Sequence, residues 1–304
     1  MHASLWVRIK RSWQLYVLLV IPVALVVLFQ YVPMYGAQIA FRNYNIRDGI
    51  WGSEWAGMRW ITRFVTNRMF SQTLNNTLIL NLYSLAFGFP LSIMLALSLN
   101  YVRNQKYKKA IQMVSYAPNF ISMVVVVGMM YQFFNPYFGA IGKLLSLLSG
   151  QSVDVFLNPA SFRHVYVWSG VWQSLGFSSI IYISALSSVS PELHESATID
   201  GANIMARIWH IDLPAILPIT IINLIMSTGG LLNSGFEKVL LLQNTLNLQT
   251  SEVIDTYAYK IGLASSMPNY SYGAAIGLFK SVVCFILMII VNQISRRVSE
   301  TSLW

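Results

Sequence analysis

Six apolar runs, each near or above the length a helix needs to cross a bilayer, constrain this chain more than any other feature. The hydrocarbon core is about 30 Å thick, so about 20 apolar helical residues span it. Pro22, Pro90 and Pro118 fall within runs, and transmembrane helices tolerate proline where neighbouring groups satisfy the freed backbone. The sequence therefore predicts an all-α integral membrane protein with six transmembrane helices. The runs are Trp13–Val32, Leu74–Tyr101, Ile111–Phe134, His164–Val189, Ala215–Leu232 and Ser271–Ser295.

The scarcity of charged residues supports the same class. Of the 304 residues, 10% are charged and 55% are apolar, whereas soluble domains carry about 25% charged residues. The net charge of +9 does not indicate a nucleic-acid partner, because the basic residues lie in short clusters beside apolar runs rather than along one face. Cys284 is the single cysteine, so no disulfide can form within the chain. The histidines have no metal-ligand spacing, and we expect no metal site.

Basic residues beside the runs predict the orientation. Arg8, Lys10 and Arg11 precede the first run, and such residues concentrate on the cytoplasmic side of a membrane. We therefore expect residues 1–12 to form a cytoplasmic segment and residues 13–304 to form one six-helix domain. The first run exceeds the length of a typical signal-peptide core and is expected to remain as an anchor. Alternation then places the loop 190–214 and the carboxyl terminus in the cytoplasm.

The segment Glu195–Pro214 is a polar, turn-bearing stretch between the fourth and fifth runs. Glu195, Ser196 and Ala197 are followed by three residues, then Gly201, then nine residues before Ile211, Leu213 and Pro214. Glycine takes a positive φ without steric cost, and a carboxylate can pair with an arginine of a partner. Two short helices joined at this glycine would form a rigid body that projects from the membrane. Such a body could transmit force from a protein in water to helices in lipid.

This spacing, Glu-Ala-Ala-x3-Gly-x9-Ile-x-Leu-Pro, resembles the cytoplasmic loop by which membrane subunits of ATP-binding-cassette importers dock on their ATPase. The chain departs at Ser196, where the family usually has alanine, and serine is small enough to pack similarly. The resemblance implies that Thr198–Arg207 is the coupling helix and that Glu195 lies in a cleft of the ATPase. The docking residues are then Glu195, Ser196, Ala197, Asp200, Gly201, Ala202, Arg207, Leu213 and Pro214.

Other segments resemble the six-helix permeases of carbohydrate importers, especially those for oligosaccharides and polysaccharides. This resemblance covers almost the whole chain and is carried by Pro191–Ala202, Tyr116–Val125, Gly235–Leu242, Val253–Tyr259, Ser271–Phe279 and Ser302–Trp304.

The resemblance implies a complex in a bacterial cell membrane. A second, related permease, two ATPase subunits and an extracellular solute-binding protein would be the partners, with membrane lipid around them. The oligosaccharide would cross by alternating access. ATP and Mg²⁺ would bind at the partner ATPase, and this chain would bind no cofactor. The sequence has no Gly-x4-Gly-Lys-Ser/Thr phosphate loop, so we expect the chain not to be an enzyme itself.

Polar and aromatic residues near the runs are candidates for the substrate path, because sugars present hydroxyls and flat apolar faces. The same residues could instead serve interhelical hydrogen bonds and interfacial belts. Lys280, nine residues into the last run, needs a partner or water, and Glu237 is one candidate partner. The predicted path residues are Asn233, Phe236, Glu237, Trp172, Gln173, Tyr83 and Lys280, with Asn81, Ser84, Trp168, Tyr182 and Asn223 as further polar or aromatic groups.

Two other functions remain open at this point. An importer of an amino acid, phosphate or polyamine would share the docking loop, and the long outer segment 34–73 argues against it. An ATP-independent carrier or membrane enzyme would need carboxylates inside the runs, and apart from Glu237 near an end we find none.

Overall fold

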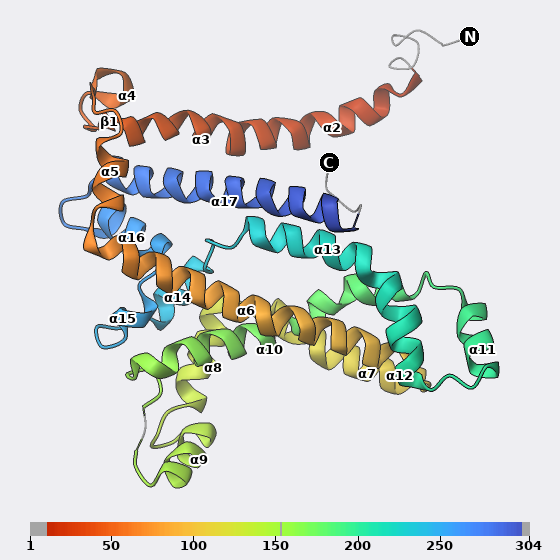
Figure 1. Ribbon diagram of the computed structural model, residues 1–304. Coiled ribbons are helices and arrows are strands. Elements are labelled where there is room, and N and C mark those ends of the chain that lie inside the picture. Colours follow the sequence, from red (N-terminus) through yellow and green to blue (C-terminus); the bar gives the residue numbers. More distant parts are fainter. Residues whose placement is uncertain (1–10, 153, 300–304) are drawn as a thin grey trace. The chain divides into compact units, whose positions relative to one another are not determined.

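The computed structural model describes residues 11–152 and 154–299, which form two compact, almost entirely helical units (Figure 1). The first unit comprises residues 11–66 and Ala258–Phe279, and the second comprises Asn67–Tyr257 and residues 280–299. Arg8, Lys10 and the tail Ser302–Trp304 lie outside the described residues. The expectation of a single domain stays a prediction.

The first unit begins with one continuous helical rod. It consists of α2 (Trp13–Val26), a π-helical turn (Val27–Tyr31), α3 (Val32–Met34) and a 3₁₀ segment (Tyr35–Phe41). All residues from 13 to 35 are exposed, and an apolar helix with no buried face is stable only in lipid or against another subunit. The first predicted span is therefore present as a helix that needs a nonaqueous environment.

A small aromatic cap completes the first unit. Strands β1 (Arg42–Asn43) and β2 (Glu54–Trp55) pair antiparallel, with α4 (Gly49–Gly52) between them and α5 (Arg59–Val65) after them. The Arg42 guanidinium lies 5.7 Å and 5.6 Å from the ring centroids of Trp51 and Trp55. The unit also contains a second π-helical turn, Lys260–Ala264, and α17 (Tyr270–Ser299) as far as Phe279.

Helices α6 (Arg68–Asn100) and α10 (Pro159–Leu186) form the centre of the second unit. The side chains of Asn67 and Asn158 cap them by accepting hydrogen bonds from backbone N–H groups. Apolar residues of both helices pack with those of neighbouring helices into a buried core. Its members are Leu80, Val126, Val127, Met130, Phe156, Phe162, Tyr166, Val167, Val171, Val239, Leu242 and Val253.

The third predicted span is interrupted. Helix α7 (Gln105–Tyr116) and the 3₁₀ turn Ala117–Phe120 are followed by α8 (Met123–Phe133) at a bend of 102°. The predicted span Ile111–Phe134 is therefore present as two helices in different directions rather than as one straight helix. Pro118 cannot donate a backbone hydrogen bond, and Ser122 accepts one from Val125 N as the cap of a new helix.

The remaining elements of the second unit follow the same chain order. They are α9 (Ala140–Ser149), α11 (Pro191–Ile199), α12 (Ile204–Arg207), a π-helical turn (Ile208–Asp212), α13 (Leu213–Gly229), α14 (Phe236–Leu242), α15 (Leu248–Ser251), α16 (Ile254–Tyr259) and the rest of α17.

Four helices in the described chain are long and apolar enough to cross a membrane, or five if the bent pair is one span. Helix α10 has 28 residues but is not among them, because it carries serine, glutamine, arginine and histidine between its apolar residues. Several of its polar side chains face protein: Gln173 and Ser179 are buried. The described residues therefore contain four or five of the six predicted spans by length and hydropathy, and α10, which covers most of the fourth predicted run, is long enough but too polar to be counted.

Candidate functional site

The loop between α10 and α13 folds into two short helices joined at a glycine. Helix α11 begins at Pro191 after the Ser190 cap, and Gly201 adopts φ +79° in the turn that follows it. The Asn203 side chain accepts a hydrogen bond from Ala206 N and starts α12. The left-handed turn predicted at Gly201 is confirmed, and only glycine takes this conformation without strain.

The coupling helix is not continuous over Thr198–Arg207. Helix α11 ends at Ile199 and helical structure resumes at Ile204. From there α12, the π-helical turn and α13 form one span, Ile204–Gly229. Pro214 lies two residues after the π-helical turn. Its missing N–H is accommodated there because the π-helical turn has already interrupted the regular α-helical hydrogen-bond pattern.

The exposed surface of this loop combines predicted docking residues with large apolar side chains. Glu195, Ser196, Asp200, Gly201 and Pro214 are exposed, whereas the other four predicted residues are half-buried. Ile199 is 86% exposed. Several large exposed apolar side chains on so short a loop indicate a surface for a protein partner. This surface, which we call the docking face, includes Leu193, Ile199, Ile204, Met205 and Trp209.

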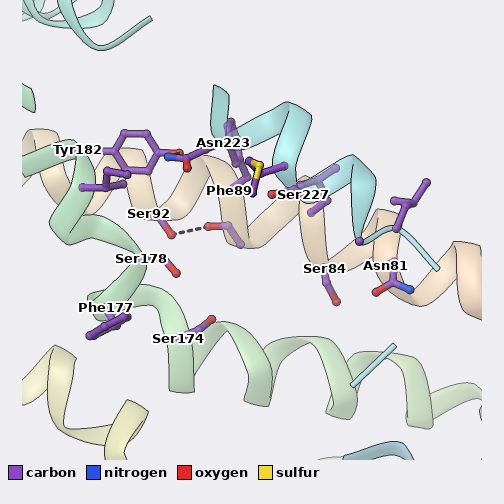
Figure 2. Close-up of a pocket in the computed structure, with 16 residues that line it drawn as sticks. Asn81, Ser84, Phe89, Ser92, Ser174, Phe177, Ser178, Tyr182, Asn223 and Ser227 are labelled. Atoms are coloured by element: carbon purple, nitrogen blue, oxygen red, sulfur yellow. Dashed lines mark hydrogen bonds between the residues drawn. The ribbon is translucent and has the colours of Figure 1, made fainter. Parts of the chain in front are cut away.

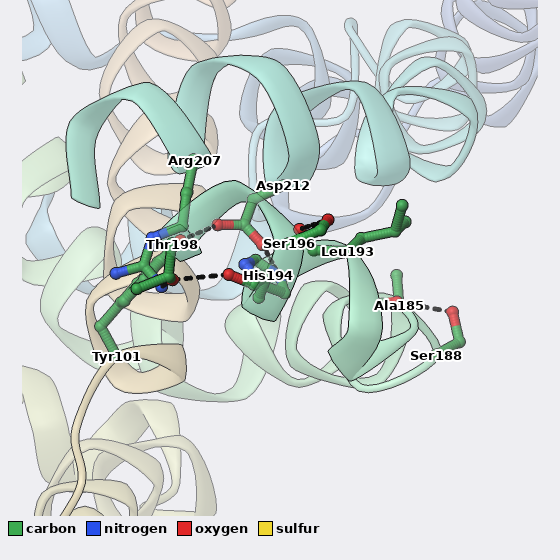
Figure 3. Close-up of polar contacts among 9 residues, drawn as sticks. All are labelled: Tyr101, Ala185, Ser188, Leu193, His194, Ser196, Thr198, Arg207 and Asp212. Atoms are coloured by element: carbon green, nitrogen blue, oxygen red, sulfur yellow. Dashed lines mark hydrogen bonds and ion pairs between the residues drawn. The ribbon is translucent and has the colours of Figure 1, made fainter. Parts of the chain in front are cut away.

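Beneath the docking face, polar side chains from three elements meet (Figure 3). Tyr101, just beyond the last residue of α6, donates its hydroxyl to Asp212 Oδ2 at 2.6 Å. His194 Nε2 of α11 lies 3.4 Å from Asp212 Oδ1. The Arg207 guanidinium lies 5.5 Å from the centroid of the Tyr101 ring and donates to Thr198 Oγ1 at 3.0 Å. Arg207, predicted to contact the ATPase, is therefore directed into the loop itself.

Burial and then the hydrogen bond to Asp212 raise the pKa of Tyr101. The phenol is therefore protonated at all physiological pH values and can act only as the donor to the carboxylate. This fixes the direction of the hydrogen bond that joins α6 to the start of α13.

A cavity of about 680 Å³ lies among α6, α10, α13 and the turn after α13 (Figure 2). Hydroxyl and amide groups point into it, two phenylalanine rings flank it, and its lining residues carry no charged side chain. The lining residues are Asn81, Ser84, Leu85, Gly88, Phe89, Ser92, Ser174, Phe177, Ser178, Ile181, Tyr182, Asn223, Met226, Ser227, Gly230 and Leu231.

Several polar groups of this cavity are only partly used within the protein. Ser92 and Ser174 donate to carbonyls of their own helices, at 2.7 Å and 2.9 Å, which leaves their oxygens able to accept. Asn223 Nδ2 lies 3.5 Å from Tyr182 OH, a long contact that a ligand hydroxyl can replace. The arrangement suits a hydroxyl-bearing ligand with flat apolar faces.

The predicted path residues lie elsewhere in the structure. Trp172 lines a second, mainly apolar cavity between α8, α9 and α10, and Gln173 donates to Ile121 O at 3.0 Å. Tyr83 OH bonds His164 Nδ1 at 2.8 Å and accepts from Trp168 Nε1 at 3.1 Å. The residues Asn233, Phe236 and Glu237 are exposed.

Lys280 does not pair with Glu237. Its ammonium group forms an ion pair with Asp255 of α16, so the partner expected from the sequence is wrong. Helices α16 and α17 instead bring Asp255 to Lys280.

Four residues first considered as additional polar groups do line the cavity: Asn81, Ser84, Tyr182 and Asn223. Two buried charged residues, Asp212 and Lys238, were not singled out from the sequence. Asp212 occupies an unspecified position of the docking pattern, and Lys238 immediately follows Glu237. Both could have been found in the sequence as charged residues that lie beside long apolar runs.

Comparison with known proteins gives matches over nearly the whole chain. The family described as binding-protein-dependent transport system inner membrane component matches residues 88–300. Protein LplB of Bacillus subtilis (strain 168) is 39% identical over 97% of this chain and 92% of its own. The polygalacturonan/rhamnogalacturonan transport system permease protein YteP of the same organism is 37% identical over 99% and 93%.

Two solved structures have the same fold. One is of a bacterial ABC transporter involved in the import of the acidic polysaccharide alginate. Its matching chain has a TM-score of 0.86 and 36% identity, covering 97% of this chain and 99% of its own. The other is the bacterial alginate ABC transporter in complex with an alginate pentasaccharide-bound periplasmic protein, with a TM-score of 0.88, 36% identity and coverage of 99% and 100%. The importer permease fold expected from the sequence is confirmed.

Proposed function

This chain belongs to the family of binding-protein-dependent transport system inner membrane components, and we propose that it carries fragments of an acidic polysaccharide into the cytoplasm. It is a permease subunit of an ABC importer for sugars or oligosaccharides. The finer choice of an acidic cargo is supported by two similar proteins, whose names refer to polygalacturonan and to alginate.

The observation that carries the proposal is the cavity among α6, α10 and α13. Serine, asparagine and tyrosine groups can exchange hydrogen bonds with sugar hydroxyls, and Phe89 and Phe177 can lie against the apolar faces of sugar rings. An uncharged lining also suits passage, because a site must hold its cargo weakly enough to release it. A cluster of cations would retain a polyanion.

The docking face connects this chain to the ATPase that drives transport. Two ATPase subunits bind ATP and Mg²⁺, and one of them receives Glu195 and the apolar side chains of the docking face. This chain, whose sequence lacks a Gly-x4-Gly-Lys-Ser/Thr phosphate loop, transmits the motion of the ATPase to its helices. A second permease completes the translocation path, and an extracellular solute-binding protein delivers the oligosaccharide.

The topology follows from this arrangement. The docking face must be cytoplasmic to meet the ATPase, so both chain termini are cytoplasmic and the aromatic cap of residues 42–65 lies on the outer side. The basic cluster Arg8, Lys10 and Arg11 agrees with this orientation.

The experiment that tests the proposal is purification of the chain from its native membrane, with identification of the proteins that accompany it. We expect an ATPase, a second permease and a sugar-binding protein. The complex is then placed in liposomes with ATP inside, and uptake of oligogalacturonate or oligoalginate is compared with uptake of a neutral oligosaccharide of equal length. Preferential uptake of an amino acid, phosphate or polyamine would overturn the proposal.

A pair of matched variants tests the path. Asn223→Leu removes an amide from the cavity lining, whereas Asn233→Leu makes the same change at an exposed residue beyond it. We expect Asn223→Leu to reduce the rate of uptake by about tenfold, equivalent to about 1.4 kcal/mol, and Asn233→Leu to reduce it little. The reverse order would place the path at the turn between α13 and α14 instead.

A further inference from the structure

All nine residues of α11 are described, and none of them is buried. Hydrophobic packing therefore contributes little to holding this helix against the rest of the protein. A helix that receives a push from a partner must nevertheless move its own subunit rather than swing freely. The rigidity has to come from other contacts.

Asp212 provides such a contact from the base of α13. Its side chain is 0% exposed, and a buried carboxylate is stable only if it is paired or hydrogen-bonded. Tyr101 binds one carboxylate oxygen at 2.6 Å, and His194 approaches the other at 3.4 Å. Hydrogen bonds to a charged group are about twice as strong as those between neutral groups. The low dielectric of a buried site strengthens them further.

The three residues come from the three elements that have to move together (Figure 3). His194 belongs to α11 of the docking loop, Asp212 ends the π-helical turn that leads into α13, and Tyr101 directly follows α6. Helices α6 and α13 supply half or more of the polar lining of the cavity, including Ser84 and Asn223. Asp212 thus joins the docking loop to two helices that line the cavity.

We propose that Asp212 is a positioning residue that, through His194 and Tyr101, transmits movement of the docking loop to α6 and α13. The inference rests on the proposed function, because it requires an ATPase that moves the loop. At 3.4 Å the contact from His194 exceeds the usual hydrogen-bond range. Tyr101 therefore fixes Asp212 to α6, and His194 is the part of the connection that loosens and tightens as α11 moves.

A second contact keeps the two short helices of the loop together. Thr198 Oγ1 accepts from Arg207 and donates to His194 O at 2.6 Å. The positions of His194 and Arg207 are therefore linked across the Gly201 turn. A push on either short helix reaches Asp212, because the loop moves as one body.

The test uses the assembled complex in liposomes and measures the number of ATP molecules hydrolysed for each oligosaccharide imported. Tyr101→Phe removes one hydroxyl and leaves the ring that packs against Arg207. We expect this variant to co-purify with the ATPase and to need at least roughly fivefold more ATP for each sugar, the lower end of typical coupling effects. Tyr107→Phe, which removes the hydroxyl of an exposed tyrosine on α7, is the matched control and keeps the wild-type ratio.

Asp212→Asn distinguishes the contact with Tyr101 from the contact with His194. The amide oxygen can still accept from Tyr101, but the charge that attracts His194 is lost. We expect an intermediate ratio, and we expect Tyr101→Phe combined with Asp212→Asn to be no worse than the poorer single variant, since both act on one connection. Fully additive effects would contradict the proposal.

The outcomes separate this inference from the proposed function. If the wild-type complex imports no oligosaccharide, the proposed function fails. If it imports one and Tyr101→Phe has the same ratio as the wild type, the proposed function stands and the role of Asp212 is refuted. If Tyr101→Phe no longer assembles while Tyr107→Phe does, the hydroxyl serves folding and the role in transmission is likewise refuted.

Discussion

The ammonium group of Lys280 in α17 forms an ion pair with the carboxylate of Asp255 in α16, and the two side chains are 17% and 19% exposed. Both helices lie within or beside apolar segments, where an unpaired charge is costly. The pair therefore stabilises the approach of α16 to α17, and the unexpected charge in the last apolar run has a structural partner.

Lys280→Gln should destabilise the protein, because it leaves the carboxylate of Asp255 without its partner. We expect a loss of about 1–3 kcal/mol, the usual cost of leaving a buried polar group unsatisfied. Thermal unfolding of the purified complex measures it. Lys280→Gln combined with Asp255→Asn removes both charges and should recover most of the loss. A double variant as unstable as the single one, or a change in cargo preference with stability unaltered, would show that the pair serves transport instead.

Gly201→Ala should weaken the docking loop through backbone strain alone. The residue has φ +79°, and no atom lies within 4 Å of the position that a Cβ would occupy. We expect a cost of about 1–2 kcal/mol and weaker co-purification of the ATPase. Gly128→Ala, in α8 and equally free of steric contact, is the control and should leave assembly intact. Normal ATPase binding by Gly201→Ala would contradict a structural need for the left-handed turn.

Gly176→Ala should force α10 away from α7. A Cβ at this position would lie 2.1 Å from the carbonyl oxygen of Ser115, and backbone cannot move aside as a flexible side chain can. Overpacking of this kind costs about 1–3 kcal/mol or more. The unfolding temperature of the complex should fall, with Gly128→Ala again unchanged. Equal stability of the two variants would mean that α7 and α10 do not approach this closely.

Lys238 should make stability depend on pH. It is 4% exposed in α14, and burial lowers its pKa to about 7 from 10.5. Between about pH 7 and 10.5 the unfolded chain therefore binds more protons than the folded one, so stability rises with pH across that window and is lowest below it. Lys238→Met should remove this rise.

The measurement is the unfolding temperature of the complex at pH 6.5 and pH 9, with about 2–4 °C expected for each kcal/mol. Lys143→Met on α9 is the control, since its side chain is not buried. If the wild type and Lys238→Met respond equally to pH, the Lys238 ammonium is accommodated by Tyr166 O, to which it donates at 2.8 Å.

The sequence allowed prediction of those features that depend on one residue and its neighbours. Apolar run length located the helices, and the glycine in a polar loop located the Gly201 turn. The interruption of the third span was missed although Pro118 was noted, because a proline inside a membrane helix can either be tolerated or end it. The outcome depends on whether a cap such as Ser122 is followed by a new helix in a different direction.

The candidate site could not be predicted in the same way, because it is formed by contacts between residues that are far apart in the sequence. Asp212 lies 111 residues from Tyr101 along the chain, and nothing in the pattern around Leu213 specifies its partner. The same holds for Lys280, whose neighbour in space became Asp255. Which face of α10 borders the cavity also depends on packing. Tyr182 lines it and Trp172 does not, although both are aromatic residues of one helix.

Helix α10 has a consequence for the synthesis of the chain. Taken alone it enters lipid poorly, because its polar side chains would meet hydrocarbon without partners. Residues such as Gln173 and Tyr166 become acceptable only once their partners, Ile121 O and Ser234 O, are present. One of these partners is made before α10 and the other after it. Residues well beyond Leu186 must therefore be synthesised before α10 can insert stably into the bilayer. Its insertion is a late step that depends on the neighbouring helices.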